Sequence, residues 1–304
     1  MRVLVTGAKG MLANALLPCL KDAHEVTGVD LNDFDISQEA AVQKAFRDVR
    51  PEFVYHLAAY TDVDGCEGNP QLAMLVNAEG TANLARASAE VGATMLYVST
   101  DYVFDGSGDK PWREDAPPNP LSVYGQSKLN GERAVAASLK NYLIARSSWL
   151  FGPGGKNFVS TILKLASQTD ELKVVSDQKG SPTYTRHLAP KLAELIGCKS
   201  YGIYHVTGSG SCSWYEFTQA ILQSGGFDKV RVSPITTLQS GRKAPRPAFS
   251  VLENRRLTES HLGLLPHWSQ GLAEYVAEGQ RLGEFTLPGA STGEKMSQSG
   301  SNKP

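Results

Sequence analysis

Residues 1–13, MRVLVTGAKGMLA, decide the fold class of this 304-residue chain. The β-branched run Val3–Thr6 leads directly into two glycines, and an apolar helical pattern starts at Met11. Glycines between a strand and a helix let the turn close, and they let backbone N–H groups approach a pyrophosphate. The stretch predicts a dinucleotide-binding turn, although this spacing also occurs in ordinary strand-to-helix connections. The predicted ligand contacts in the turn are Gly7, Gly10, Met11 and Leu12.

Working outward from this turn, short β-branched runs alternate with longer stretches of helical period, which is the pattern of βαβ units. Strands are predicted at Val3–Thr6, Glu25–Val29, Phe53–Leu57, Thr94–Ser99 and Tyr142–Arg146. Amphipathic helices are predicted at Met11–Asp22, Gln38–Val49, Pro70–Val91 and Ser122–Leu139. The fold class is therefore α/β, with a doubly wound parallel sheet of the Rossmann type. Ligands of such sheets bind beyond the carboxyl ends of the strands.

Beyond Trp149 the pattern becomes irregular, with loop signals such as GPGGKN (152–157) and TGSGSCS (207–213). We expect residues 1–150 to form the dinucleotide-binding domain, and residues 151–172 and 207–285 to form a smaller α/β substrate-binding lobe. Within 173–206, the segments Lys173–Val175 and Gly202–Val206 are candidates for strands that return to the main sheet. Residues 286–304 contain almost nothing that could be buried, and they are predicted to be a disordered tail.

Composition excludes several functional classes. The 30 Lys and Arg residues balance 31 Asp and Glu residues, for a formal net charge of −1, so the sequence favours neither nucleic acid nor a membrane surface as a partner. No run approaches the roughly 18 apolar residues of a membrane span, and residues 1–10 lack the apolar stretch and the cleavage site that are typical of a signal peptide. The four scattered cysteines are typical of reduced thiols, which favours a cytoplasmic location. A homo-oligomer is neither indicated nor excluded.

Asp30 stands twenty residues after Gly10, at the end of the second predicted strand. From that place a carboxylate hydrogen-bonds a ribose 2′-hydroxyl and repels a 2′-phosphate. It therefore predicts a preference for NADH over NADPH. The alternative is a solvated aspartate in an Asp- and Asn-rich turn.

The most discriminating motif is Tyr124-Gly125-Gln126-Ser127-Lys128, in which a tyrosine and a lysine share one face of a helix. A nearby ammonium lowers a phenol's pKa and allows it to exchange a proton near neutral pH. The hydroxyls of Ser99 and Thr100 end the fourth strand, where one can donate a hydrogen bond to a carbonyl oxygen that gains charge during hydride transfer. A packed tyrosine beside a surface lysine is the alternative reading of an isolated motif.

The glycine turn, STDYVFDG (99–106) and YGQSK (124–128) together resemble the extended short-chain dehydrogenase/reductases. Three further stretches, HLAAYTDVDGCE (56–67), DQKGSPT (177–183) and RPAFSVLENRRL (246–257), resemble the dTDP-4-dehydrorhamnose reductase family within them. The resemblance runs from Arg2 to about Leu282. It implies reduction of the 4-keto group of dTDP-6-deoxy-L-lyxo-4-hexulose to dTDP-L-rhamnose, with NADH or NADPH as cofactor and the dTDP-4-keto-6-deoxy sugar as substrate.

The resemblance also implies roles for individual residues. The catalytic triad would be Thr100, Tyr124 and Lys128. Cofactor contacts besides the turn, Asp30 and the Tyr124–Lys128 pair would be Asp35, Ile36, Leu57, Ala58, Ala59, Tyr60, Asn77 and Ser99. Substrate contacts besides Thr100 would be Asp101, Tyr102, Val103, Trp149, Asn157, Ser181 and Thr183. Apart from the resemblance, Arg246 lies with Arg242 and Lys243 in a Pro-rich loop and is suited to bind the nucleotide diphosphate; a solvated loop is the alternative. Some members dimerise through magnesium held by a first-helix glutamate, but the matching position here is Ala15, so no metal is expected.

Two alternatives to this function remain open. A nucleotide-sugar 4-ketoreductase that gives the other C4 epimer would share nearly every motif, because stereochemistry depends on which sugar face meets the nicotinamide. A non-catalytic subunit is the alternative from another class, since the same fold serves as the regulatory β-subunit of methionine adenosyltransferase. The intact triad argues against the second alternative.

Overall fold

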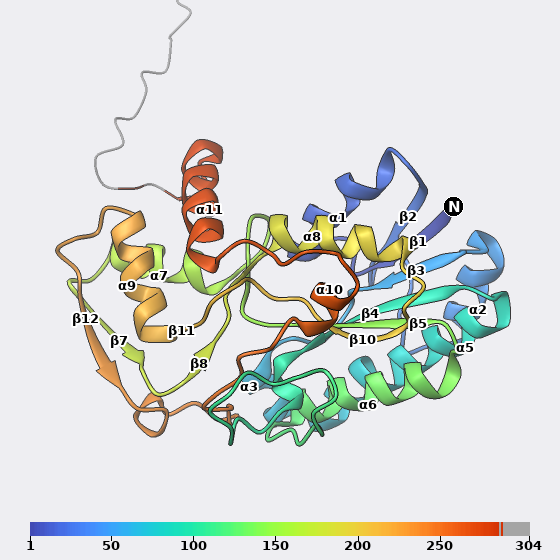
Figure 1. The fold of residues 1–304 in the computed structure, drawn as a ribbon, viewed down its shortest axis with the longest axis horizontal. Coiled ribbons are helices and arrows are strands. Elements are labelled where there is room, and N and C mark those ends of the chain that lie inside the picture. The colour runs from blue at the N-terminus through green and yellow to red at the C-terminus, as the bar shows by residue number, and fades with distance from the viewer. Residues whose placement is uncertain (286, 288–304) are drawn as a thin grey trace, which may run out of the picture.

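The computed structural model describes residues 1–285 and 287. Its centre is a six-stranded, fully parallel sheet with the strand order β10-β5-β4-β3-β1-β2 (Figure 1). The strands are β1 (Arg2–Thr6), β2 (Glu25–Val29), β3 (Phe53–His56), β4 (Thr94–Thr100), β5 (Tyr142–Ser147) and β10 (Gly202–His205). The strand order reverses between β1 and β3, where such sheets bind ligands. The predicted doubly wound fold is confirmed.

Helices cover both faces of the sheet (Figure 1). On one face lie α1 (Met11–Lys21) and α8 (Thr185–Glu194); on the other lie α2 (Glu39–Val49), α5 (Thr81–Val91) and α6 (Val123–Ser138). Successive residues of a strand point to opposite faces, so Val3 and Val5 join the core under α1 and α8, whereas Leu4 joins the core on the other face. All three are fully buried, which explains why β1 is continuously apolar rather than alternating.

The long helix predicted at Pro70–Val91 is interrupted. It consists of α4 (Pro70–Met74), a π-helical turn η1 (Leu75–Gly80) and α5. A short helix that the sequence did not predict, α3 (Val63–Gly68), precedes it. The π turn adds one residue per turn and turns Asn77 inward, where it is fully buried.

The carboxyl-terminal lobe has its own apolar core, around Phe151, Phe217 and Tyr275. Its helices are α7 (Phe158–Ala166), α9 (Trp214–Ser224) and α11 (Trp268–Leu282), and its main strands are β7 (Glu171–Val175) and β12 (Arg231–Ile235). Shorter elements complete the chain: η2 (Asp101–Val103), β6 (Leu150–Phe151), β8 (Lys179–Gly180), β9 (Thr183–Tyr184), η3 (Leu195–Gly197), β11 (Cys212–Ser213), η4 (Leu238–Ser240) and α10 (Arg255–Glu259).

One of the two candidate returning strands joins the main sheet. β10 pairs in parallel with β5, whereas β7 does not return as expected. The backbone groups of β7 pair with β12 instead, and both strands pack against α9 inside the lobe. Apart from Leu287, the predicted tail 286–304 lies outside the described residues.

Candidate active site

A cavity of 970 Å³ opens at the carboxyl ends of the first five strands. Each strand contributes the residues that follow it: Gly7 after β1, Asp30 after β2, Leu57 after β3, Asp101 after β4 and Ser148 after β5. The cavity brings together the predicted residues Gly7, Gly10, Met11, Leu12, Asp30, Asp35, Ile36, Leu57, Ala58, Ala59, Tyr60, Ser99, Thr100, Asp101, Tyr102, Tyr124, Lys128 and Trp149.

The glycine turn leaves room for a ligand at the start of α1. Gly7 has a φ of +69°, and a Cβ there would lie 2.8 Å from the backbone nitrogen of Ala58, so only glycine fits. The Gly10 N–H donates to the Gly7 carbonyl at 2.9 Å and closes the turn. Gly10 caps α1 without a side chain, which leaves the first N–H groups of the helix free to bind an anion. These features fit a dinucleotide pyrophosphate.

Asp30 is fixed at the wall of this cavity. Its carboxylate accepts hydrogen bonds from the backbone N–H of Lys9 at 3.0 Å and from that of Leu31 at 2.9 Å. The carboxylate oxygens retain lone pairs that can accept a hydrogen bond from a ribose hydroxyl.

Tyr124 and Lys128 lie one turn apart near the start of α6. Ser122 caps this helix by accepting a hydrogen bond from Gly125 N–H at 3.1 Å, and Glu67 of α3 accepts one from Val123 N–H at 2.8 Å. The start of the helix is thereby fixed on two sides. The Tyr124 ring meets Tyr102 edge to face, with centroids 5.9 Å apart.

The expected effect of Lys128 on Tyr124 is not what the structure shows. The lysine Nζ donates to the Val98 carbonyl at 2.8 Å and lies 4.1 Å from the centre of the Tyr97 ring. Burial raises the pKa of the Tyr124 phenol, an effect that the Thr100 hydroxyl opposes, and burial lowers the pKa of Lys128 to about 7. Desolvation disfavours both charged forms, so it outweighs the attraction that the motif alone suggests.

Thr100 and Asp101 form a small polar unit beside the phenol. The Thr100 hydroxyl donates to Asp101 Oδ1 at 3.1 Å and accepts from Tyr102 N–H at 3.2 Å. Asp101 is 2% exposed, and its Oδ2 has no hydrogen-bond partner among the described residues. Burial raises the pKa of this carboxyl to about 7, against hydrogen bonds from Ser250 and Thr100. A substrate hydroxyl would satisfy the unpaired oxygen.

Two tryptophans form the wall of the cavity on the side of the lobe. The indoles of Trp149 and Trp214 stack with centroids 3.4 Å apart and planes 4° apart, and Phe158 packs on Trp214. Trp149 has a φ of +48°, a conformation that costs a non-glycine residue of order 1–3 kcal/mol and clusters at functional sites. The sequence reasoning missed Trp214, because no local motif relates it to Trp149.

Six predicted residues do not line the cavity: Asn77, Val103, Asn157, Ser181, Thr183 and Arg246. Asn77 lies behind it, where its side chain binds the backbone N–H and carbonyl of Tyr60 and the hydroxyl of Ser127. It connects the loop after β3 to the helix of the Tyr-Lys pair.

Four of the others take part in packing and capping. Val103 is fully buried beside Phe104. Asn157 caps α7, and the hydroxyls of Ser181 and Thr183 bind backbone carbonyls of the lobe.

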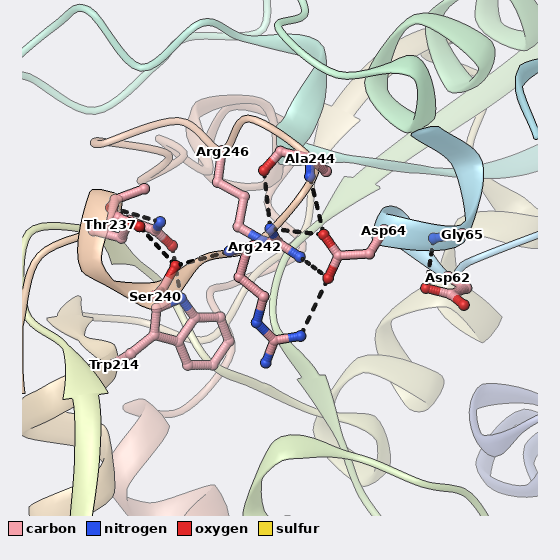
Figure 2. A network of polar contacts seen from close by, with 10 residues as sticks. Asp62, Asp64, Gly65, Trp214, Thr237, Ser240, Arg242, Ala244 and Arg246 are labelled. Carbon is pink, nitrogen blue, oxygen red and sulfur yellow. Dashed lines mark hydrogen bonds and ion pairs between the residues drawn. The ribbon is translucent and has the colours of Figure 1, made fainter. Parts of the chain in front are cut away.

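Arg246 lies on a loop of the lobe and binds Asp64 of α3. Figure 2 shows Arg242 and Arg246 converging on this carboxylate, with nitrogen–oxygen distances of 3.2 Å and 2.9 Å. The Ala244 N–H donates to the same carboxylate at 3.0 Å. These contacts hold the pKa of Asp64 well below its ordinary value and join the lobe to the dinucleotide-binding domain.

The described residues contain neither a metal-binding cluster nor a membrane-spanning helix. No three His, Cys, Asp or Glu side chains within them gather closely enough to hold a metal ion. None of the helices in this part of the chain is long and apolar enough to cross a membrane. Ala15 of α1 is 8% exposed and packs in the core between this helix and the sheet.

Comparison with known proteins places this site in a family. Residues 1–281 match the family model described as RmlD substrate binding domain. The dTDP-4-dehydrorhamnose reductase of Streptomyces griseus is 44% identical, over 90% of this chain and 92% of that protein. The spore coat polysaccharide biosynthesis protein SpsK of Bacillus subtilis is also 44% identical, over 91% of this chain and 97% of that protein.

A solved structure agrees with this assignment. The crystal structure of dTDP-4-dehydrorhamnose reductase from Bacillus anthracis in complex with NADP superposes with a TM-score of 0.89. The two proteins are 39% identical, and the match covers 91% of this chain and 99% of that one. The chain therefore belongs to the RmlD substrate binding domain family, with the dTDP-4-dehydrorhamnose reductases that it matches.

Proposed function

We propose that this protein reduces the 4-keto group of dTDP-4-dehydro-L-rhamnose to give dTDP-L-rhamnose, with NADH or NADPH as reductant. The observation that supports it most strongly is that one cavity contains both the glycine turn of Gly7 and the group formed by Thr100, Tyr124 and Lys128. A ligand bound at the turn can thus extend to the phenol. When bound, the dinucleotide supplies a hydride to carbon C4 of the sugar.

The proton comes from Tyr124. As hydride reaches C4, negative charge develops on the carbonyl oxygen, and the phenol transfers its proton to that oxygen. Its raised pKa keeps the phenol protonated until that moment. The Thr100 hydroxyl, which now donates to Asp101, can rotate to donate a second hydrogen bond to the same oxygen.

Lys128 provides the balancing charge. With a pKa lowered to about 7, its ammonium form is present below that pH and is lost as the pH rises through it. The ammonium stabilises the phenolate that remains after proton transfer. Turnover should accordingly fall on the alkaline side of neutrality.

The sugar nucleotide would enter from the side of the lobe. Trp149 and Trp214 offer aromatic surface for it, and Lys156 lines the same wall. Arg242 and Arg246, which Asp64 anchors outside the lining of the cavity, are suited to a diphosphate that extends past it, because a guanidinium matches the geometry of phosphate oxygens. We also propose a cytoplasmic location, on the ground that the four cysteines are free thiols.

The decisive experiment incubates the protein with the 4-keto-6-deoxy sugar nucleotide and either NADH or NADPH, and identifies the product by NMR. The expected product has the L-rhamno configuration. The other C4 epimer would assign the protein to a different 4-ketoreductase class. Cofactor binding without turnover would favour the non-catalytic subunit instead.

A further inference from the structure

A buried ion pair lies directly behind the proposed catalytic lysine. Glu132 of α6 and Arg146 of β5 form a two-pronged contact, with Nε–Oε1 and Nη2–Oε2 distances of 2.9 Å and 2.7 Å. Their side chains are 4% and 2% exposed. Replacing such a pair by apolar residues is often neutral for stability, so stability alone does not explain it.

The pair connects the elements that hold the catalytic groups. Glu132 also accepts a hydrogen bond from the Ser99 hydroxyl at 2.6 Å, and Ser99 lies opposite Arg146 in the pairing of β4 with β5. Thr100 is the next residue of β4, and Lys128 lies one helical turn before Glu132. A single carboxylate therefore joins β4, β5 and α6 beside the cavity.

The titratable groups that face Lys128 come from three elements. Tyr124 and Glu132 come from its own helix, Tyr97 from β4 and His56 from β3. Burial holds the pKa of His56 well below its ordinary value, so that ring is neutral.

Arg146 binds the Glu132 carboxylate from β5. Its Nη1 has no hydrogen-bond partner among the described residues, and its guanidinium lies 5.1 Å from the centre of the Phe104 ring. Neither member of the pair is screened by water.

We propose, on the basis of the function proposed above, that Glu132 and Arg146 are positioning residues that set the charge of Lys128 and hence the pH range of the reduction. Burial lowers the pKa of Lys128, and the Glu132 carboxylate is the group that opposes this effect. Arg146 holds that carboxylate in place through two hydrogen bonds, while its own positive charge limits how far the carboxylate can act. The net charge near the lysine is thus set by two buried groups that do not touch the substrate cavity.

The sign of each change follows from Coulomb attraction. Glu132→Gln removes the negative charge and leaves the positive charge of Arg146 uncompensated, so the pKa of Lys128 falls further. Adding Arg146→Met removes that positive charge as well, so the pKa rises again toward its original value. A purely structural role predicts neither this order nor a recovery on the second substitution.

The test measures the pH profile of kcat/KM, with NADPH and the 4-keto sugar nucleotide, for the full-length protein and three variants. In Glu132→Gln the alkaline limb should move to lower pH by about one pH unit or more. In Glu132→Gln/Arg146→Met the alkaline limb should lie at a pH between that of Glu132→Gln and that of the wild type. The matched control is Arg133→Gln, a charge change on the exposed side of the same helix, which should leave the limb in place because water and salt screen it.

An alkaline limb that stays in place in Glu132→Gln, or one that lies lower in the double variant than in the single, overturns the proposal. Folding is checked by circular dichroism and by NADPH fluorescence, because Glu132→Gln leaves the buried charge of Arg146 without its partner. If Glu132→Gln does not fold, the double variant decides, and an alkaline limb at a higher pH than in the wild type refutes the role. Absence of turnover in the wild type would instead refute the proposed reductase function.

Discussion

Replacing Tyr124 by phenylalanine isolates the proposed proton donor from the rest of the site. The substitution removes one hydroxyl and keeps the ring, so the edge-to-face contact with Tyr102 is preserved. Thr100 retains its bond to Asp101. At most one net hydrogen bond is lost, worth about 1 kcal/mol of folding free energy, which corresponds to a fall of about 4 °C or less in Tm.

The effect on turnover should be much larger. Loss of a positioned acid–base group typically reduces the rate by about 10²–10⁴-fold, or about 2.7–5.4 kcal/mol of transition-state free energy. The assay follows NADPH absorbance at saturating sugar nucleotide, and fluorescence titration measures the cofactor Kd, which should stay within about twofold. A variant that retains more than about a tenth of the wild-type kcat would refute the assignment of Tyr124 as proton donor.

Three further predictions concern the rest of the site. Asp64→Asn removes the charge that holds Arg242 and Arg246 in place. The KM for the sugar nucleotide should therefore rise about fivefold, equivalent to about 1 kcal/mol, while kcat stays nearly unchanged. A fall in kcat without a rise in KM would contradict this anchoring role of Asp64. Asp30 should give NADH the higher kcat/KM, and a tenfold advantage for NADPH, about 1.4 kcal/mol, would overturn this expectation. Because the Ala15 side chain offers no oxygen ligand, excess EDTA should change neither turnover nor the sedimentation coefficient. If EDTA halves the apparent molecular mass and added magnesium restores it, other carboxylates bind the ion and the expectation is wrong.

The sequence predicts the sheet well because the strands are local signals. The predicted bounds of the six strands in the main sheet agree with the structure to within one residue, since each β-branched run ends at a turn. The helix predicted at Pro70–Val91 was wrong in detail. Its π turn is associated with bonds from Asn77 to Tyr60 and Ser127, which are contacts between distant segments that periodicity cannot show.

The site was predictable where a motif is continuous. The spacing of Tyr124 and Lys128 correctly predicts a shared helix face, but it does not reveal that the lysine binds the Val98 carbonyl. Trp214 and the pairing of Asp64 with Arg246 join segments far apart in the chain, so no window of sequence contains both partners.

The return of β10 to the sheet limits how this protein can be divided. A chain ending at Trp149 would keep the glycine turn and the Tyr-Lys pair, yet it would lose the strand that covers β5. The freed backbone groups of β5 would then form an exposed edge, on which another copy could add a strand and start aggregation. It would also lose α8, which packs against α1 over the same core. We therefore expect that residues 1–149 would not fold as a stable unit on their own, and that the lobe could not be exchanged for another as a simple terminal fusion.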